Sequence, residues 1–154
     1  MSAYDNLKLN HQLCFALYAA THSLTRAYRS SLEPLGITYT QYLVMLVLWE
    51  TDGISVGKIA QRLELDSATL TPMLKRLEAA GFISRVRNQK DERIVEIKLT
   101  AVGNDLQHQI AKVQLGVACQ TGLNTEEFNQ LKDTLHRLVG TMSNTESNAE
   151  AQAS

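Results

Sequence analysis

The apolar residues between positions 55 and 99 change from helical spacing to alternation, and this change limits the folds open to the chain. Four of them recur every three or four residues, as on one face of a helix, namely Leu70, Met73, Leu74 and Leu77. Residues 82–87 and 93–99 instead alternate apolar with polar side chains, as half-buried strands do. The polar run 88–92 between them fits the tip of a hairpin. The pattern therefore predicts a helix followed by a two-stranded hairpin.

Helical spacing and end signals place three more helices before this one. The predicted ranges are 10 or 11 to about 33, 41–50 and 56–63, followed by the fourth helix from Asp66 or Ser67 to Ala80. Thr38 or Thr40, and then Ser55, stand where N-cap side chains accept hydrogen bonds from free amides. Pro72 lies inside the fourth helix and removes one backbone hydrogen bond, but the longer helix is still expected.

Two helices are predicted after the hairpin, and the first of them is apolar on two sides. Thr100 caps this helix, which runs to about Gln120, and Asn124 or Thr125 caps the next. One face holds Leu106, Ile110, Val113 and Val117, and the opposite face holds Ala111, Leu115, Ala118 and Cys119. A helix that is apolar on both sides is buried on both, so we expect a second copy of the chain to cover the outer face.

The order helix, turn, helix, hairpin predicts a mainly α fold with a small β-hairpin wing, a winged helix-turn-helix. We expect one domain in which residues 38–99 form this winged region. Residues 1–36 and 101–142 are expected to form helical dimerisation regions on either side of it. From Ser143 onward the residues are polar or small, which predicts a disordered tail over 143–154.

The formal net charge of −1 hides an uneven distribution of charge. Residues 55–98 carry nine Lys/Arg against six Asp/Glu, whereas the other 110 residues carry six against ten. A local basic region on a near-neutral protein suffices to bind phosphate. No secretory signal opens the chain, and the longest apolar run, 42–49, is too short to cross a bilayer. We therefore expect a cytoplasmic protein with no membrane partner, whose two cysteines form no disulfide framework.

In a winged helix-turn-helix the second helix enters the major groove of duplex DNA, the partner predicted here. The polar and basic residues of that helix are Ser67, Thr69, Thr71, Lys75 and Arg76. The wing adds Arg85, Arg87, Lys90 and Arg93. An arginine at the wing tip suits a narrow minor groove. His11 and Cys14 lack a second pair of metal-binding residues, so we expect no metal site, no cofactor and no enzymatic activity.

Several local patterns follow one another in a characteristic order. They are Ile59-Ala60-Gln61-Arg62-Leu63, Asp66-Ser67-Ala68-Thr69-Leu70-Thr71-Pro72-Met73-Leu74, Gly81-Phe82-Ile83, Asp91-Glu92-Arg93 and Leu99-Thr100-Ala101-Val102-Gly103. Together they resemble the MarR family of bacterial regulators. Two further patterns are Asn10-His11-Gln12-Leu13-Cys14-Phe15 and Leu35-Gly36-Ile37-Thr38-Tyr39-Thr40-Gln41-Tyr42. Within the family these resemble the organic hydroperoxide resistance regulators (OhrR), and the resemblance covers residues 7–140.

The resemblance implies a homodimer whose first, fifth and sixth helices intertwine and whose two winged regions bind a palindromic operator. It also implies that Asp91 supports the wing tip and that Arg93 enters the minor groove. A bacterial, cytoplasmic regulator is the corresponding expectation.

The resemblance further implies a peroxide-sensing cysteine near the start of the first helix, which here is Cys14. Tyr28 and Tyr39 match tyrosines that hydrogen-bond this cysteine in the family. Cys119 matches the resolving cysteine of the two-cysteine kind, in which oxidation ends in a disulfide between subunits. The implied function is a repressor that releases its operator when an organic hydroperoxide oxidises Cys14.

The residues themselves leave other functions open. Cys14 lies in the first helical turn, where free amides and the helix dipole favour the nucleophilic thiolate. It also lies at the edge of an apolar stripe formed by Leu13 and Leu17, so inert packing stays possible, as interface packing does for Cys119. A regulator released by a small phenolic ligand would keep its response in a Cys14→Ser variant. A thiol peroxidase would turn over hydroperoxide without affinity for DNA.

Overall fold

The computed structural model describes residues 4–152, and the chain forms two compact units. The first unit extends to Val117, and the second begins at Ala118, within the same helix. In the described residues the first unit contains all the strands and most of the helices. None of the helices in this part of the chain combines the length and the apolar character needed to cross a membrane.

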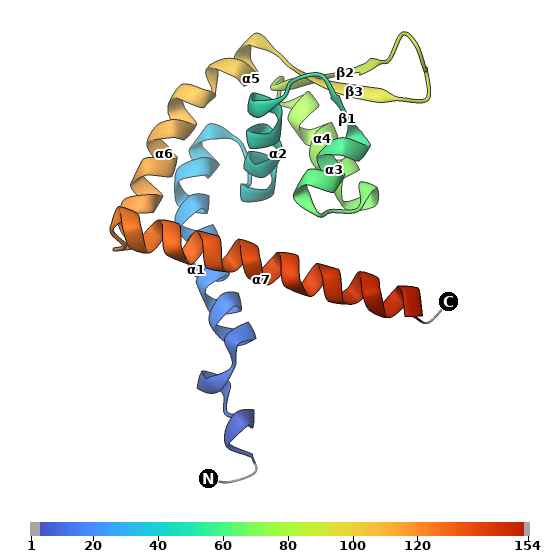
Figure 1. Cartoon of the computed structure of the whole chain (residues 1–154). Coiled ribbons are helices and arrows are strands. Elements are labelled where there is room, and N and C mark those ends of the chain that lie inside the picture. Colours follow the sequence, from blue (N-terminus) through green and yellow to red (C-terminus); the bar gives the residue numbers. More distant parts are fainter. Residues whose placement is uncertain (1–3, 153–154) are drawn as a thin grey trace. The chain divides into compact units, whose positions relative to one another are not determined.

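The elements of the first unit confirm the predicted fold class, mainly α with a small β wing (Figure 1). In chain order they are the 3-10 turns Asp5–Leu7 and Leu9–His11, α1 (Leu13–Leu32), the 3-10 turn Glu33–Leu35, α2 (Tyr39–Glu50), β1 (Ile54–Ser55), α3 (Val56–Leu63), α4 (Ser67–Ala79), β2 (Ile83–Arg87), β3 (Val95–Leu99), α5 (Ala101–Asp105) and α6 (Gln107–Gln120). Two predicted boundaries were wrong. The first helix begins at Leu13 after two 3-10 turns, and the helix after the wing is divided at Leu106 into α5 and α6. Gly103 lowers the helical propensity of the short first piece.

Hydroxyl and carboxyl side chains cap four of these helices. At α2, Thr38 Oγ accepts a hydrogen bond from the Gln41 amide at 3.3 Å, and Gln41 Oε1 accepts one from the Thr38 amide at 2.8 Å. Ser55 and Asp66 cap α3 and α4. Thr100 caps α5. The predicted caps are confirmed, because each of these side chains accepts from an amide that has no partner inside its helix.

The predicted hairpin belongs to a three-stranded antiparallel sheet in the order β1–β3–β2. β2 and β3 pair along their whole length, with Arg85 opposite Ile97. β1 adds only Ile54 and Ser55 at the other side of β3. Two residues are too few to show alternation, and for this reason the sequence did not predict β1.

The core of the first unit surrounds α2, which contacts α1, α3, α4 and β3 (Figure 1). The side chains that are almost fully buried come from all of these elements: Leu32, Val44, Met45, Leu48, Ile59, Leu70, Leu74, Leu77, Ile83 and Ile97. Burial of a side chain of this size stabilises a fold by about 1.5–3 kcal/mol. This core therefore fixes α4 and the wing relative to each other.

The backbone of α5 lies in close contact with the backbone at the root of the wing, at a position where α5 carries a glycine. Trp49 Nε1 donates a hydrogen bond to the Gly103 carbonyl at 3.0 Å. The Thr100 amide donates to the Phe82 carbonyl at 3.1 Å. A Cβ at position 103 would lie 1.9 Å from the same Phe82 oxygen, so only glycine fits there.

The second unit consists of the end of α6, a turn and α7 (Thr125–Gln152). Asn124 Oδ1 accepts hydrogen bonds from the amides of Glu126 and Glu127, each at 3.0 Å, and so provides the N-cap. The predicted disorder from Ser143 is contradicted up to Gln152, because the helix continues to that residue. The segment after Gly140 contains no proline or glycine, which would break a helix, and its three Ala, two Glu and one Gln are good helix formers. The last two residues of the predicted tail, 153–154, lie outside the described residues.

Large apolar side chains remain exposed on α1, α6 and α7. On α1, Leu13 and Tyr18 are each 62% exposed, and on α6 Leu115 is 64% exposed. On α7 the exposed apolar side chains are Phe128, Leu131, Val139 and Met142. Each unit thus carries apolar helix faces that its own residues do not cover.

Candidate DNA interface and redox site

The residues predicted to read DNA lie on the outer face of α4. They are Ser67, Thr69, Thr71, Lys75 and Arg76. All are exposed except Thr71, which is half-buried. The leucines of the same helix face the core, so the polar and apolar faces are separated as the sequence predicted. Pro72 does not end α4, which continues from Ser67 to Ala79.

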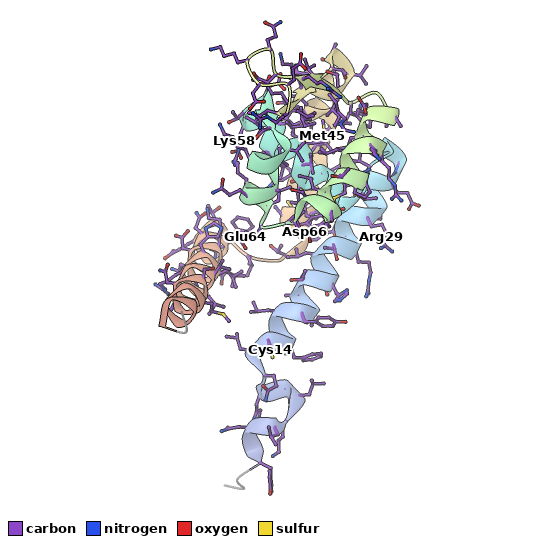
Figure 2. The ribbon with its side chains drawn as sticks, turned by 90° about the vertical axis from the view of Figure 1, so that its right-hand side faces the viewer. Cys14, Arg29, Met45, Lys58, Glu64 and Asp66 are labelled. Carbon is purple, nitrogen blue, oxygen red and sulfur yellow. The ribbon has the colours of Figure 1, made fainter. Side chains whose placement is uncertain are left out.

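Asp66 holds the first turn of α4 in place (Figure 2). Its Oδ1 accepts a hydrogen bond from the Thr69 amide at 2.6 Å, and its Oδ2 accepts one from the Thr69 hydroxyl at 2.9 Å. These hydrogen bonds favour the carboxylate and hold the pKa of Asp66 below its ordinary value. The Thr71 hydroxyl donates to the Ser67 carbonyl at 2.7 Å. Both threonine protons are therefore used within the helix, which leaves their hydroxyl oxygens free to act as acceptors.

The wing projects from the helices of the first unit and ends in a polar loop (Figure 1). The predicted contacts Arg87 and Lys90 are exposed, and the Arg93 side chain is 94% exposed. The structure brings Asp91 and Arg93 together at the wing tip. Asp91 Oδ1 accepts from the Arg93 amide at 3.0 Å and from Arg93 Nε at 3.4 Å.

Arg85 differs from the other wing arginines because its side chain is half-buried at the root of the wing. It lies opposite Ile97, which is fully buried. Its Nε is buried and has no hydrogen-bond partner among the described residues. A cavity of about 350 Å³ lies between Arg85 and the start of α3, where it is lined by the N-cap Ser55 and by Val56 and Gly57. This position suits contact with a backbone phosphate better than contact with a base edge.

Cys14 is the second residue of α1 and is exposed. The predicted position in the first helical turn is therefore confirmed. Figure 2 shows Cys14 on the part of α1 that extends beyond the packed helices of the first unit. Leu13 and Phe15 beside it are exposed as well, so within one chain they do not enclose the thiol.

Tyr28 and Tyr39 contact each other, but they do not contact Cys14 of the same chain. Their ring centroids are 5.2 Å apart, and Tyr42 completes the cluster at 5.2 Å from Tyr28 and 5.9 Å from Tyr39. Cys14 and Tyr28 lie on the same helix, fourteen residues and therefore about 21 Å apart along its axis. A hydrogen bond from Tyr28 to this thiol thus requires the thiol of another protomer.

The sequence did not indicate that Tyr42 belongs to this cluster, because its position in α2 is typical of one more apolar core residue. Burial raises its pKa, and its hydrogen bond with Tyr28 raises the pKa further. Burial also raises the pKa of Tyr39, with a smaller contribution from Tyr28. Tyr39 and Tyr42 therefore both favour the protonated form. The Tyr42 proton is used in the hydrogen bond with Tyr28, whereas the Tyr39 hydroxyl proton remains available as a donor.

Cys119 belongs to the second unit and lies in the last turn of α6, where it is exposed. Its carbonyl accepts a hydrogen bond from the Gly122 amide at 3.3 Å, at the turn before α7. Both cysteines are free thiols on the surface of the single chain.

Comparisons with known proteins agree with this arrangement. Residues 26–110 match the family described as transcriptional regulator SarA/Rot. The organic hydroperoxide resistance transcriptional regulator of Bacillus subtilis (strain 168) is 44% identical over 142 residues, which cover 90% of this chain and 95% of that protein. The HTH-type transcriptional regulator TtmR of Methylorubrum extorquens (strain PA1) is 50% identical over 131 residues, covering 85% and 67% respectively.

Solved structures of AbfR, a protein of Staphylococcus epidermidis, have the same fold. Reduced AbfR bound to DNA matches with a TM-score of 0.78 at 35% identity, covering 93% of this chain and 98% of that chain. Disulfide-formed AbfR matches with a TM-score of 0.65 at 36% identity, covering 91% and 93%.

A three-stranded wing beside two connected helices, the second with a polar and basic outer face, defines a winged helix-turn-helix transcription regulator that binds DNA. The relatives narrow this class: the chain belongs to the MarR family, as a regulator of the OhrR type. It is a regulator and not an enzyme.

Proposed function

We propose that this protein is a homodimeric repressor that senses organic hydroperoxides. In its reduced form it binds a palindromic operator. Oxidation of Cys14, followed by a disulfide to Cys119 of the other subunit, releases the DNA. The observation that carries the proposal is the exposed Cys14 thiol in the first turn of α1, on a helix with an uncovered apolar face.

Exposed apolar side chains on all three flanking helices support the dimer. A soluble chain rarely leaves large apolar side chains such as Leu13, Leu115 and Leu131 uncovered together. The proposed role of Tyr28 also requires a dimer, because Tyr28 reaches a sensing thiol only across a subunit boundary. The disulfide form known for AbfR is a precedent for oxidation within this fold.

The oxidation follows ordinary thiol chemistry. The Cys14 thiolate attacks the outer oxygen of the hydroperoxide, the O–O bond breaks, and the alcohol leaves after taking up a proton. The product at Cys14 is a sulfenic acid. The Cys119 thiol then attacks this sulfur, water leaves, and a disulfide forms. The peroxide is reduced by two electrons, which the two thiols supply.

The tyrosine cluster assists the first step. Tyr28 and Tyr39 of one subunit are the proposed donors to the thiolate of the other. Because burial keeps Tyr39 protonated, its hydroxyl is available to stabilise an anionic sulfur. The apolar residues Leu13 and Phe15 beside Cys14 favour alkyl or lipid hydroperoxides over hydrogen peroxide.

In the dimer, the two copies of α4 read successive major grooves. Lys75 and Arg76 are the proposed contacts to phosphate or guanine, together with the hydroxyl-bearing residues at the start of α4. Arg93 is the proposed minor-groove contact and Arg85 a phosphate contact. Release follows when oxidation changes the spacing of the two reading helices, which no longer matches the half-sites.

A second candidate function rests on a cavity of about 560 Å³ beside Tyr39. Its lining consists of Thr25, Arg29, Glu33, Gly36, Ile37, Thr38, Tyr39 and Thr40. A cavity with an arginine and several hydroxyls suits a small phenolic ligand. In this alternative the ligand releases the DNA and the cysteines are inert.

The deciding experiment measures operator binding by reduced protein before and after one equivalent of cumene hydroperoxide. The variants are Cys14→Ser and Cys119→Ser. We expect the wild type to release DNA and Cys14→Ser to stay bound. A non-reducing gel should show a linked dimer that requires both cysteines. If Cys14→Ser releases as readily as the wild type, the redox proposal fails and the phenolic alternative is tested by adding the phenol.

A further inference from the structure

The wing tip contains one exposed arginine and three half-buried polar side chains. Arg93 is almost fully exposed, whereas Asp91, Asn88 and Glu96 are half-buried beneath it. A polar loop without such anchors samples many conformations, and ordering it on DNA lowers affinity. The side chains that fix the loop therefore influence how tightly the wing binds.

Asn88 uses both ends of its side-chain amide to close this loop. Its Nδ2 donates to Glu96 Oε1 on the neighbouring strand β3. Its Oδ1 accepts from the Lys90 amide at 2.8 Å and from the Asp91 amide at 3.1 Å. Its own backbone amide donates to the Ile94 carbonyl at 2.9 Å. One residue thus connects the loop backbone to both strands of the wing.

Asp91 connects the loop that Asn88 fixes to the side chain of Arg93. Asn88 fixes the Asp91 amide, and the Asp91 carboxylate in turn accepts from the amide and from Nε of Arg93. The Ile94 amide donates to the Asp91 carbonyl at 3.0 Å, which closes the turn. The contacts form a continuous series from Glu96 through Asn88 and Asp91 to Arg93.

We propose that Asn88 is a positioning residue for DNA binding. Anchored by Glu96, it holds the free wing in the conformation in which Asp91 presents Arg93 to the minor groove. Asn88 acts through Arg93 and not by touching DNA. The inference rests on the proposed minor-groove role of Arg93.

A reciprocal exchange tests the pair: each single substitution changes the net charge of the wing by one unit, and the double variant restores the original charge. Asn88→Asp keeps the acceptor for the Lys90 and Asp91 amides but places a second carboxylate against Glu96. Glu96→Gln alone keeps an acceptor oxygen for Asn88. We expect Asn88→Asp to weaken operator binding by about tenfold. The double variant Asn88→Asp/Glu96→Gln restores binding, because the new side-chain amide at position 96 then donates to the new carboxylate at position 88.

A double-mutant cycle tests whether Asn88 acts through Arg93. We expect Asn88→Ala to weaken operator binding by about five- to tenfold in the wild type and less than about twofold in an Arg93→Ala background. Hydroxyl-radical footprints should lose protection in the minor groove under the wing and keep it in the major groove under α4. The helicity and unfolding midpoint of each variant serve as the folding control.

The outcomes distinguish the inference about Asn88 from the proposed minor-groove role of Arg93, on which it rests. If Arg93→Ala leaves binding unchanged, the proposed role of the wing arginine fails, and the inference about Asn88 fails with it. If Arg93→Ala weakens binding but Asn88→Ala does not, the inference alone is overturned. It is overturned also if the Asn88→Ala effect persists undiminished without Arg93, or if the exchange does not restore affinity.

Discussion

The winged region, from α2 to β3, buries its apolar side chains within the chain, whereas α1, α6 and α7 leave many of theirs exposed. Leu70 and Leu74 of α4 are at most 1% exposed, but Leu13 of α1 and Leu115 of α6 are more than 60% exposed. The first region therefore folds by its own contacts. In the proposed dimer the second region is completed by contacts with another copy. Substitutions in the first region should therefore lower the stability of the fold, and those in the second should lower dimerisation.

The largest effect is expected for Leu74→Ala in the winged region. Removing a fully buried leucine leaves a cavity, so the free energy of unfolding should fall by about 2–5 kcal/mol at any protein concentration. Urea denaturation measures this change. The control Lys75→Ala, at the exposed neighbouring position, should leave the unfolding free energy nearly unchanged and weaken only DNA binding. An equal loss of stability in both variants would contradict the burial described for α4.

Leu115→Glu tests the other region. Placing a charge on the proposed subunit interface should convert the dimer to a monomer in analytical ultracentrifugation. Operator affinity should fall by about a hundredfold or more, since one half-site contact is lost, which corresponds to about 2.7 kcal/mol. Gln114→Glu adds the same charge at the adjacent exposed position and should remain dimeric. A Leu115→Glu variant that stays dimeric would place the interface elsewhere.

Gly103→Ala addresses the contact between α5 and the root of the wing. The added methyl group would overlap the Phe82 carbonyl oxygen, so we expect a loss of about 1–3 kcal/mol in thermal or urea unfolding. Gly57→Ala in α3 is the matched control, because nothing lies within 4 Å of its added Cβ. That variant should gain about 0.5–1 kcal/mol. A neutral Gly103→Ala would mean that the wing root and α5 are not in contact.

The smallest effect concerns the tyrosine cluster at high pH. The pKa of Tyr42 is raised above its ordinary value near 10, so the stability from keeping it protonated is complete below pH 10. Above that pH the unfolded chain ionises first, and the unfolding free energy should fall by about 1.4 kcal/mol per pH unit for this residue. Tyr42→Phe should remove this slope. Tyr18→Phe, at an exposed position of α1, should leave it unchanged.

Local signals in the sequence were sufficient for the helices and the hairpin of the winged region, but not for the two-residue strand β1. The caps Thr38, Ser55 and Asp66 are defined by residue type and spacing, and the leucines of α4 by helical periodicity. These features depend on neighbours within a few positions along the chain, so the sequence predicts them well. The prediction of a disordered tail was wrong because it rested on the polar composition and did not consider the helical propensity of the Ala, Glu and Gln residues.

Contacts between distant residues could not be predicted in the same way. Nothing in the local sequence indicates that Tyr42 joins Tyr28 and Tyr39, or that Asn88 contacts Glu96. The resemblance to OhrR implied a hydrogen bond between Tyr28 and Cys14, but the length of α1 shows that the two residues of one chain cannot form it. The proposed pairing would therefore form only between two subunits, and a single sequence does not show how subunits assemble.

The missing side chain at Gly103 also has a mechanical consequence. Where backbone meets backbone, no rotatable group can absorb a displacement, so a tilt of α5 must carry the root of the wing with it. Trp49 adds a third attachment from α2 to the same point. The joint thus behaves as a rigid coupling, and the next interruption of the helix along the chain is at Leu106, between α5 and α6.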